Sequence, residues 1–160
     1  MSTADAELPH APTVPGAAPT LLIVRAPYYR GVVDGMTEGA RRILDEAGAS
    51  FVALDVSGAF ELAQAIRIAV RGPHRFDGFV AIGCVVRGET DHYDHICRTA
   101  MDGLMQVALA YGLCLGTALL TVDTLAQAEA RSSRDGHNKG AEAAVAALRQ
   151  IILARHLGAI

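Results

Sequence analysis

The sequence predicts an α/β fold: a doubly wound sheet of about four parallel strands with helices on both faces, giving three layers. Four short apolar segments have the length and composition of strands. Segments with apolar residues at helical spacing alternate with these strands along the chain. Because a parallel strand needs a crossover connection before its neighbour, this alternation is typical of a parallel sheet.

Composition limits the class of protein. The chain has 160 residues, which predicts one domain, and 17 acidic against 14 basic residues give a net charge of −3. This balance disfavours a nucleic-acid partner, whose binding needs a basic surface. No apolar run is long enough to cross a bilayer, and the first residues lack the features of a signal peptide, so we expect no membrane partner and a cytoplasmic protein. The 3 cysteines form no C-x-x-C pair and are expected to be free, buried thiols.

Residues 1–19 contain four of the 6 prolines among small and polar residues. Proline bars regular pairing, and this segment has little apolar surface to bury. We therefore expect a flexible N-terminal arm over 1–19, which could become ordered against a neighbouring subunit. Residues 20–160 are expected to form a single domain.

The first half of that domain begins with an apolar run, Leu21–Val24, suited to a strand buried on both faces. Apolar residues from Val32 to Leu44 recur at helical spacing and predict a helix that ends near Gly48. A second strand is expected over Phe51–Leu54 and a second helix over Ala59–Val70.

The second half repeats the alternation. A third strand is expected over Phe79–Ile82 and a helix over His92–Tyr111. A fourth strand follows at Leu115–Thr121, and Asp123 can cap a short helix. An alanine-rich helix is expected from about Ala141 to His156.

Ligands of such sheets bind beyond the carboxyl ends of the strands. After the first strand, Tyr28 and Tyr29 could stack on a flat ring or simply pack against a helix, and position alone does not choose. After the second, Gly58 and Ala59 allow the backbone to approach a ligand closely. Glu61 then falls in the first turn of a helix, a place that the helix dipole alone explains.

The loop after the third strand, residues 83–95, has the most functional groups. Gly88, Glu89 and Thr90 precede a helix, where backbone N–H groups can bind an anion. Thr90 or Asp91 can cap that helix. His92 falls in its first turn, where it is either a proton shuttle near neutral pH or an ordinary solvated histidine.

Two groups of polar residues are candidate ligands for a metal or a phosphate. His92 and His95 lie three residues apart, but no matching third ligand appears elsewhere, so we expect no metal. The stretch Arg131–Gly140 has two arginines and a lysine, which could clamp a phosphate or form a solvated turn between helices. The glycine-rich nucleotide motifs are absent.

Three segments together resemble one family: Ser57-Gly58-Ala59-Phe60-Glu61-Leu62, Ile82–Asp94 (IGCVVRGETDHYD), and Asn138-Lys139-Gly140 with Arg131 upstream. In order and spacing they are similar to the lumazine synthases, from about Thr20 to the end of the chain. The second segment is highly specific. The resemblance implies a flavodoxin-like fold and, over residues 20–160, a lumazine-synthase-like catalytic domain.

The family condenses 5-amino-6-(D-ribitylamino)uracil with 3,4-dihydroxy-2-butanone 4-phosphate, giving 6,7-dimethyl-8-ribityllumazine, phosphate and water, in riboflavin biosynthesis. By resemblance, His92 moves protons and no cofactor is needed. The residues implied to contact the pyrimidine substrate are Tyr28, Ala59, Phe60, Glu61, Cys84, Val85, Val86 and Thr117. Those implied to hold the phosphate are Gly88, Glu89, Thr90, Arg131 and Lys139.

The family forms homopentamers with the active site between adjacent subunits, and some members build decamers or sixty-subunit shells. We expect a free pentamer, with the larger assemblies as open alternatives. The chain departs from the family at Tyr29, where many members have Asn, and at Ser57, where Pro is common. Thr117 stands where many members lend an aromatic side chain to the neighbouring subunit, near the end of the fourth strand. These departures leave a second hypothesis, a non-catalytic lumazine- or flavin-binding or shell-forming paralogue.

Overall fold

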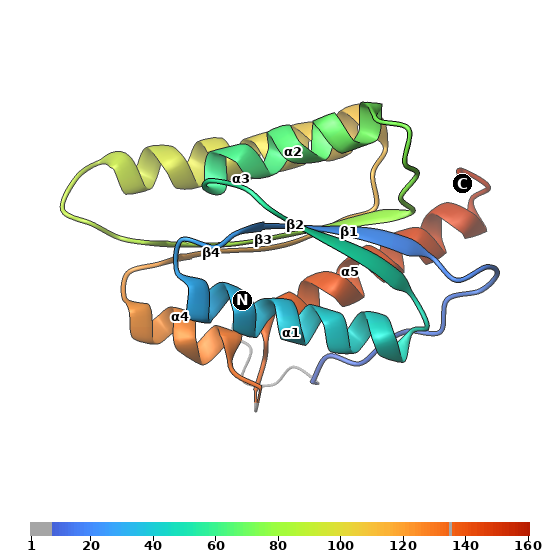
Figure 1. The fold of residues 1–160 in the computed structure, drawn as a ribbon, viewed down its shortest axis with the longest axis horizontal. Coiled ribbons are helices and arrows are strands. Elements are labelled where there is room, and N and C mark those ends of the chain that lie inside the picture. Colours follow the sequence, from blue (N-terminus) through green and yellow to red (C-terminus); the bar gives the residue numbers. More distant parts are fainter. Residues whose placement is uncertain (1–7, 135) are drawn as a thin grey trace.

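The computed structural model describes residues 8–134 and 136–160. Strands and helices alternate until the last strand, after which two helices follow in succession (Figure 1). The elements are β1 (Thr20–Ala26), α1 (Arg30–Glu46), β2 (Ser50–Asp55), α2 (Ala59–Arg71), β3 (Gly78–Val86), α3 (His92–Tyr111), β4 (Leu115–Val122), α4 (Leu125–Ser132) and α5 (Lys139–His156).

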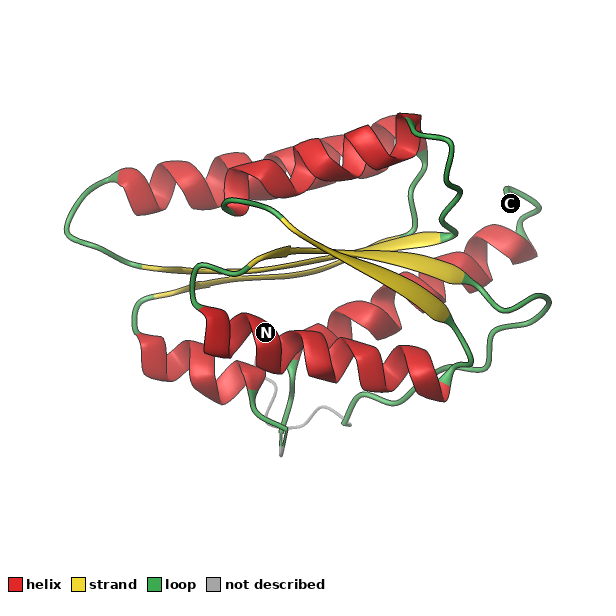
Figure 2. Cartoon of the chain, in the orientation of Figure 1, coloured by secondary structure: helices red, strands yellow, loops and turns green. Residues whose placement is uncertain are grey.

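The four strands form one parallel sheet in the order β2-β1-β3-β4. Helices α2 and α3 cover one face, and α1, α4 and α5 cover the other (Figures 1 and 2). The predicted three-layer, doubly wound, flavodoxin-like α/β fold is confirmed. No helix in the described ranges is long and apolar enough to cross a bilayer.

The central strands are buried on both faces, as their continuous apolar sequences predict. Leu21, Ile23 and Val24 are 0% exposed. One apolar cluster joins the sheet to α1, α4 and α5, and a second joins it to α2 and α3. By contrast, β2 at the edge of the sheet leaves Val52 and Leu54 47% and 45% exposed.

The third strand is longer than predicted. The sequence predicts Cys84, Val85 and Val86 in the loop, but β3 continues through them to Val86. The reason is long-range: Cys84 to Val86 pair in register with residues 120–122 of β4. The loop before α3 therefore begins only at Arg87.

The cap of α4 also differs from the prediction. Thr124, not Asp123, caps this helix: its side chain accepts from the N–H of Gln127, and the Gln127 side chain accepts in return from the N–H of Thr124. This reciprocal pair is a capping box. It leaves the Asp123 carboxylate free for another partner.

Residues 8–19 form neither helix nor strand and lie along α1 and α5 (Figure 1). Arg155 of α5 donates to the carbonyl oxygens of Pro15 and Ala17 at 2.7 and 2.8 Å. Ala11 and Val14 pack against the core. The strand β1 begins at Thr20. The division into an arm over 1–19 and one domain over 20–160, and the flexibility of the arm, stay predictions, and residues 1–7 lie outside the described residues.

Candidate active site at the carboxyl edge of the sheet

The carboxyl ends of all four strands meet at one edge, on the left of Figure 1. Three of the connections that leave this edge contain predicted site residues. Tyr28 follows β1, residues 57–61 follow β2, and residues 87–92 follow β3. The parallel topology therefore brings these three segments to one side of the molecule.

Tyr28 and Tyr29 differ in environment. The Tyr28 side chain is 79% exposed, whereas Tyr29 is half-buried and packs against the core. The two rings meet edge to face, with centroids 5.2 Å apart and planes at 64°. Tyr29 thus supports the Tyr28 ring from one side, and an open face of Tyr28 is available to stack on a planar ligand.

The start of α2 presents a carboxylate beside an exposed aromatic ring. Ala59 is buried, Phe60 is 38% exposed and Glu61 is half-buried. A Cβ added at Gly58 would lie only 3.3 Å from Oε2 of Glu61, so the carboxylate folds back over the glycine. An acceptor held in this way suits the hydroxyl groups of a sugar-like chain.

The end of β3 contributes backbone and small apolar side chains. Cys84 is 5% exposed. Burial raises the pKa of its thiol to about 11. The Cys84 thiol is therefore neutral at physiological pH and is no nucleophile. Val85 and Val86 are half-buried and pack toward opposite faces of the sheet.

The loop of residues 88–91 precedes α3 and is exposed. The N–H groups of Gly88, Glu89 and Thr90 donate to no atom within residues 8–134 and 136–160. Asp91 occupies the N-cap position, but its side chain makes no capping hydrogen bond. His92 is the exposed first residue of α3. Free N–H donors at the start of a long helix, with an imidazole beside them, can bind an anion and move protons.

A cluster around Arg87 was not anticipated from the sequence. The guanidinium donates from Nε to Asp123 at 2.9 Å and from both Nη atoms to Asp94 at 3.3 Å. Its Cζ lies 4.0 Å from the centroid of the Tyr93 ring. The hydrogen bonds to Asp123 and then Asp94 raise the pKa of Arg87 above its usual range. The only local signal was an arginine at the strand end, seven residues before Asp94.

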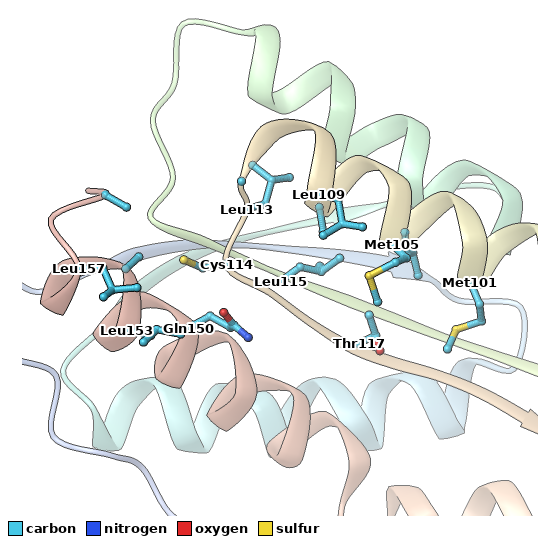
Figure 3. Close-up of a pocket in the computed structure, with 15 residues that line it drawn as sticks. Met101, Met105, Leu109, Leu113, Cys114, Leu115, Thr117, Gln150, Leu153 and Leu157 are labelled. Atoms are coloured by element: carbon cyan, nitrogen blue, oxygen red, sulfur yellow. The ribbon is translucent and has the colours of Figure 1, made fainter.

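Thr117 does not lie with these residues. It was expected near the end of the fourth strand, but it is the third residue of β4. At about 3.3 Å per residue it lies about 16 Å from the strand's carboxyl end. Its exposed side chain lines a groove of about 510 Å³ between α3, β4 and α5. In Figure 3 it lies below Met101 and Met105, with Leu109, Leu153 and Leu157 further along this α3–β4–α5 groove.

Arg131 and Lys139 lie in the other helical layer. Arg131 is exposed in the last turn of α4, where its side chain donates to the carbonyl of Gln127 at 2.9 Å. Lys139 begins α5 and pairs with Glu142 at 2.6 Å. Glu61 and His92 belong to α2 and α3, on the opposite face of the sheet (Figure 1). Among the described residues of one chain, neither Arg131 nor Lys139 therefore contacts the loop of residues 88–91.

Asn138 lies between Arg131 and Lys139 in the sequence, and it is 4% exposed. Its Oδ1 accepts from the N–H of Ala141 and caps α5. Its Nδ2 donates to the carbonyls of Gly35, Ser132 and Ser133 at 3.0, 2.8 and 3.2 Å. Its place in the Asn138-Lys139-Gly140 segment is thus explained by structure, because it joins α1, α4 and α5.

In the part of the chain that the structure describes, no group of three or more His, Cys, Asp or Glu side chains is arranged to hold a metal ion.

Known proteins match this chain over most of its length. The family model for 6,7-dimethyl-8-ribityllumazine synthase matches residues 18–155. The chain belongs to the 6,7-dimethyl-8-ribityllumazine synthase family. This match confirms the resemblance drawn from the three segments. It also confirms that the chain is an enzyme of a transferase family in riboflavin biosynthesis.

Individual lumazine synthases agree with the family match. The 6,7-dimethyl-8-ribityllumazine synthase of Paramagnetospirillum magneticum is 41% identical over 144 residues, covering 86% of this chain and 96% of that protein. The 6,7-dimethyl-8-ribityllumazine synthase 1 of Rhizobium meliloti is 43% identical over 143 residues, covering 87% and 94%. The protein of that name from Methylocella silvestris is 44% identical over 143 residues, covering 87% of each chain.

Proposed function

We propose that this protein condenses 5-amino-6-(D-ribitylamino)uracil with 3,4-dihydroxy-2-butanone 4-phosphate to give 6,7-dimethyl-8-ribityllumazine, phosphate and water. The observation that carries the proposal is the loop of residues 88–91. Its unpaired N–H groups suit a phosphate. His92 follows directly, at the first position of α3. Glu89 has the wrong charge to contact a phosphate through its side chain, so it contributes its backbone.

The pyrimidine substrate fits the neighbouring strand ends. Tyr28 offers an exposed ring for stacking, and Glu61 offers a carboxylate to the ribityl hydroxyls. Ala59 and Phe60 line the ribityl chain of the substrate. The backbone of residues 84–86 meets the edge of its pyrimidine ring. These contacts would hold the two substrates together, and proximity then provides much of the rate enhancement.

The reaction needs proton transfers and no redox step. The substrate amine attacks the ketone and an imine forms with loss of a first water, phosphate then leaves, and the ring closes with loss of a second water. His92 takes and returns protons in these steps. Arg131 and Lys139 pair with the phosphate, from a subunit other than the one that supplies His92.

We propose a homopentamer with the active site between adjacent subunits. The support is that Arg131 and Lys139 lie across the sheet from His92 in one chain (Figure 1). Apolar side chains are also exposed at both edges of the sheet, on β2 and in the α3–β4–α5 groove. Two different patches that bind each other form a heterologous contact, which gives a ring when the rotation between neighbouring subunits closes. Thr117 would then face a neighbouring subunit, and the chain 20–160 would act as one catalytic domain.

We place the protein in the cytoplasm. All of its cysteines, Cys84, Cys97 and Cys114, carry free thiols, and Cys84 and Cys114 are buried. Buried thiols without a disulfide suit a reducing compartment.

The decisive experiment mixes the purified protein with both substrates in excess chelator and follows lumazine fluorescence. Lumazine formation above the uncatalysed background supports the proposal and means that the reaction needs no metal. If the ribitylaminouracil or riboflavin binds but no lumazine forms, the protein is a binding paralogue instead. Tyr29 and Thr117 would then be the first residues to revert to the family pattern. Light scattering of the same sample distinguishes a pentamer from a decamer or a shell.

A further inference from the structure

One arginine side chain joins three elements behind the loop of residues 88–91. Arg87 stands directly after β3, Asp94 lies in the first turn of α3, and Asp123 follows β4. The guanidinium bonds both carboxylates, at 2.9 Å to Asp123 and 3.3 Å to Asp94, while its Cζ lies 4.0 Å from the Tyr93 ring centroid. The first turn of α3 is thus tied to the ends of two strands.

These contacts fix direction as well as distance. The two parallel hydrogen bonds to Asp94 set the angle between guanidinium and carboxylate. The aromatic ring of Tyr93 restricts the guanidinium from one face. The backbone N–H of Arg87 also donates to the carbonyl of Val122 at 2.9 Å. The residues on either side of the loop 88–91, Arg87 and Asp94, are therefore joined to each other and to the end of β4.

The same contacts make Arg87 a poor phosphate ligand. Its positive charge already faces two carboxylates, those of Asp94 and Asp123. An incoming phosphate would have to compete with both. The free N–H groups of the loop have no such competitors among residues 8–134 and 136–160.

We propose that Arg87 is a positioning residue, which sets the direction of the N–H groups of Gly88–Thr90 and of the His92 side chain through its bonds to Asp94 and Asp123. The proposal rests on the proposed function for its kinetic consequences. A displacement of about 1 Å in such a site can slow a reaction by about 10²-fold.

The test compares Arg87→Gln with the wild type. We expect the KM for the butanone phosphate to rise at least about tenfold and kcat to fall, since both the phosphate loop and His92 lose their frame. The KM for the ribitylaminouracil should stay unchanged, because its proposed contacts lie elsewhere. A purely structural defect would lower the amount of active enzyme without raising one KM selectively. Arg41→Gln is the matched control, because Arg41 also pairs with two carboxylates, Glu38 and Asp45, but on α1.

Asp123→Asn separates positioning from direct binding. If Arg87 positions the loop, loss of one of its two carboxylates raises the KM for the butanone phosphate. The double variant, with both Arg87→Gln and Asp123→Asn, is then less impaired than the product of the two single effects predicts. If Arg87 instead binds the phosphate itself, freeing its guanidinium from Asp123 lowers that KM and overturns the proposal.

Hydrogen–deuterium exchange of residues 87–95, without substrate, provides a readout that does not need activity. We expect exchange at the hydrogen-bonded amides of this segment, those of residues 87, 94 and 95, to accelerate about tenfold or more in Arg87→Gln and to stay unchanged in Arg41→Gln. If the wild type forms no lumazine, the proposed function fails. The exchange experiment still tests whether Arg87 positions the loop. Wild-type exchange together with wild-type KM values in Arg87→Gln would overturn the proposal.

Discussion

His92 stands exposed at the first position of α3, next to the unpaired N–H groups of the loop. Replacing it with alanine should lower kcat about 10²-fold, because general acid–base help from one side chain has this size at its lower end. Activity should not vanish, since holding two substrates together still accelerates the reaction. Steady-state lumazine fluorescence measures the change.

His95 is the matched control for His92. It is exposed on the same helix, three residues further along, and no substrate contact is proposed for it. His95→Ala should therefore keep the wild-type kcat. A His92→Ala variant that binds both substrates normally but has no activity would contradict the modest role proposed here.

Cys84 makes the stability of the fold sensitive to alkaline pH. Burial raises the pKa of its thiol from 9.0 to about 11 in the folded state. Below pH 9 the thiol is protonated in both states and has no effect on the pH dependence. Above pH 9 it ionises in the unfolded chain first, so the native state binds more protons and its stability falls as pH rises to about 11. The expected loss is about 2 kcal/mol over this window.

Urea unfolding at pH 8, 9, 10 and 11 tests this dependence. Cys84→Ala will have a lower stability at every pH, because a buried sulfur is removed. The informative quantity is the slope: the variant should lose less stability between pH 9 and pH 11 than the wild type. Equal slopes would mean that Cys84 does not contribute to the alkaline loss.

At the scale of elements, Asn138 joins three helices through one buried amide. It caps α5 and donates to carbonyls at α1 and at the end of α4. Asn138→Ala should lower the free energy of unfolding by about 2–4 kcal/mol, about 1 from the cap and the rest from carbonyls left unsatisfied. Urea denaturation followed by circular dichroism measures it.

Two variants separate these contributions. Thr124→Ala removes an exposed cap, that of α4, and should cost only about 1 kcal/mol. Asn138→Ser retains a capping oxygen without the amide donors, so its stability should fall between those of Asn138→Ala and the wild type. If Asn138→Ala costs no more than Thr124→Ala, the donated bonds contribute nothing.

The same elements show what sequence can predict. The helix over His92–Tyr111 matches α3, because the apolar period and the following Gly112 are local signals. The extension of β3 to Val86 was missed since it depends on pairing with β4. The Arg87 cluster was missed for the same reason, because Asp123 is distant in sequence.

The candidate site was likewise only partly predictable. Residues next to strand ends, such as Tyr28, Glu61 and His92, could be placed at the carboxyl edge because parallel topology alone puts them there. Arg131 and Lys139 could not be placed relative to them. Their position depends on which face of the sheet the last helices cover, and because no strand follows β4, the strand order β2-β1-β3-β4 does not fix that face.

At the scale of the whole molecule, two apolar surfaces are left exposed by the described residues of the chain. Val52 and Leu54 are exposed on β2, at one edge of the sheet. Met105 and Leu109 are 60% and 75% exposed in the α3–β4–α5 groove at the other edge. Contiguous exposed apolar surface marks an interaction site. A ring of identical subunits would cover both surfaces at once.

A shared active site predicts complementation between inactive subunits. His92→Ala and Arg131→Ala damage different faces of the chain, so each variant alone should have low activity. If each site takes His92 from one subunit and Arg131 from its neighbour, some interfaces in a mixed ring have both residues intact. Activity should therefore recover when the two variants are unfolded together and refolded as a mixture.

The control mixture combines Arg131→Ala with Lys139→Ala, two changes in the same helical layer of the chain. Every site then takes both cations from a single subunit and has one defect, so no activity should return. Recovery in the first mixture but not in the second would assign His92 and Arg131 of one site to different subunits. Failure of the first mixture, with mixed rings demonstrated by native mass spectrometry, would mean that Arg131 does not act across the interface.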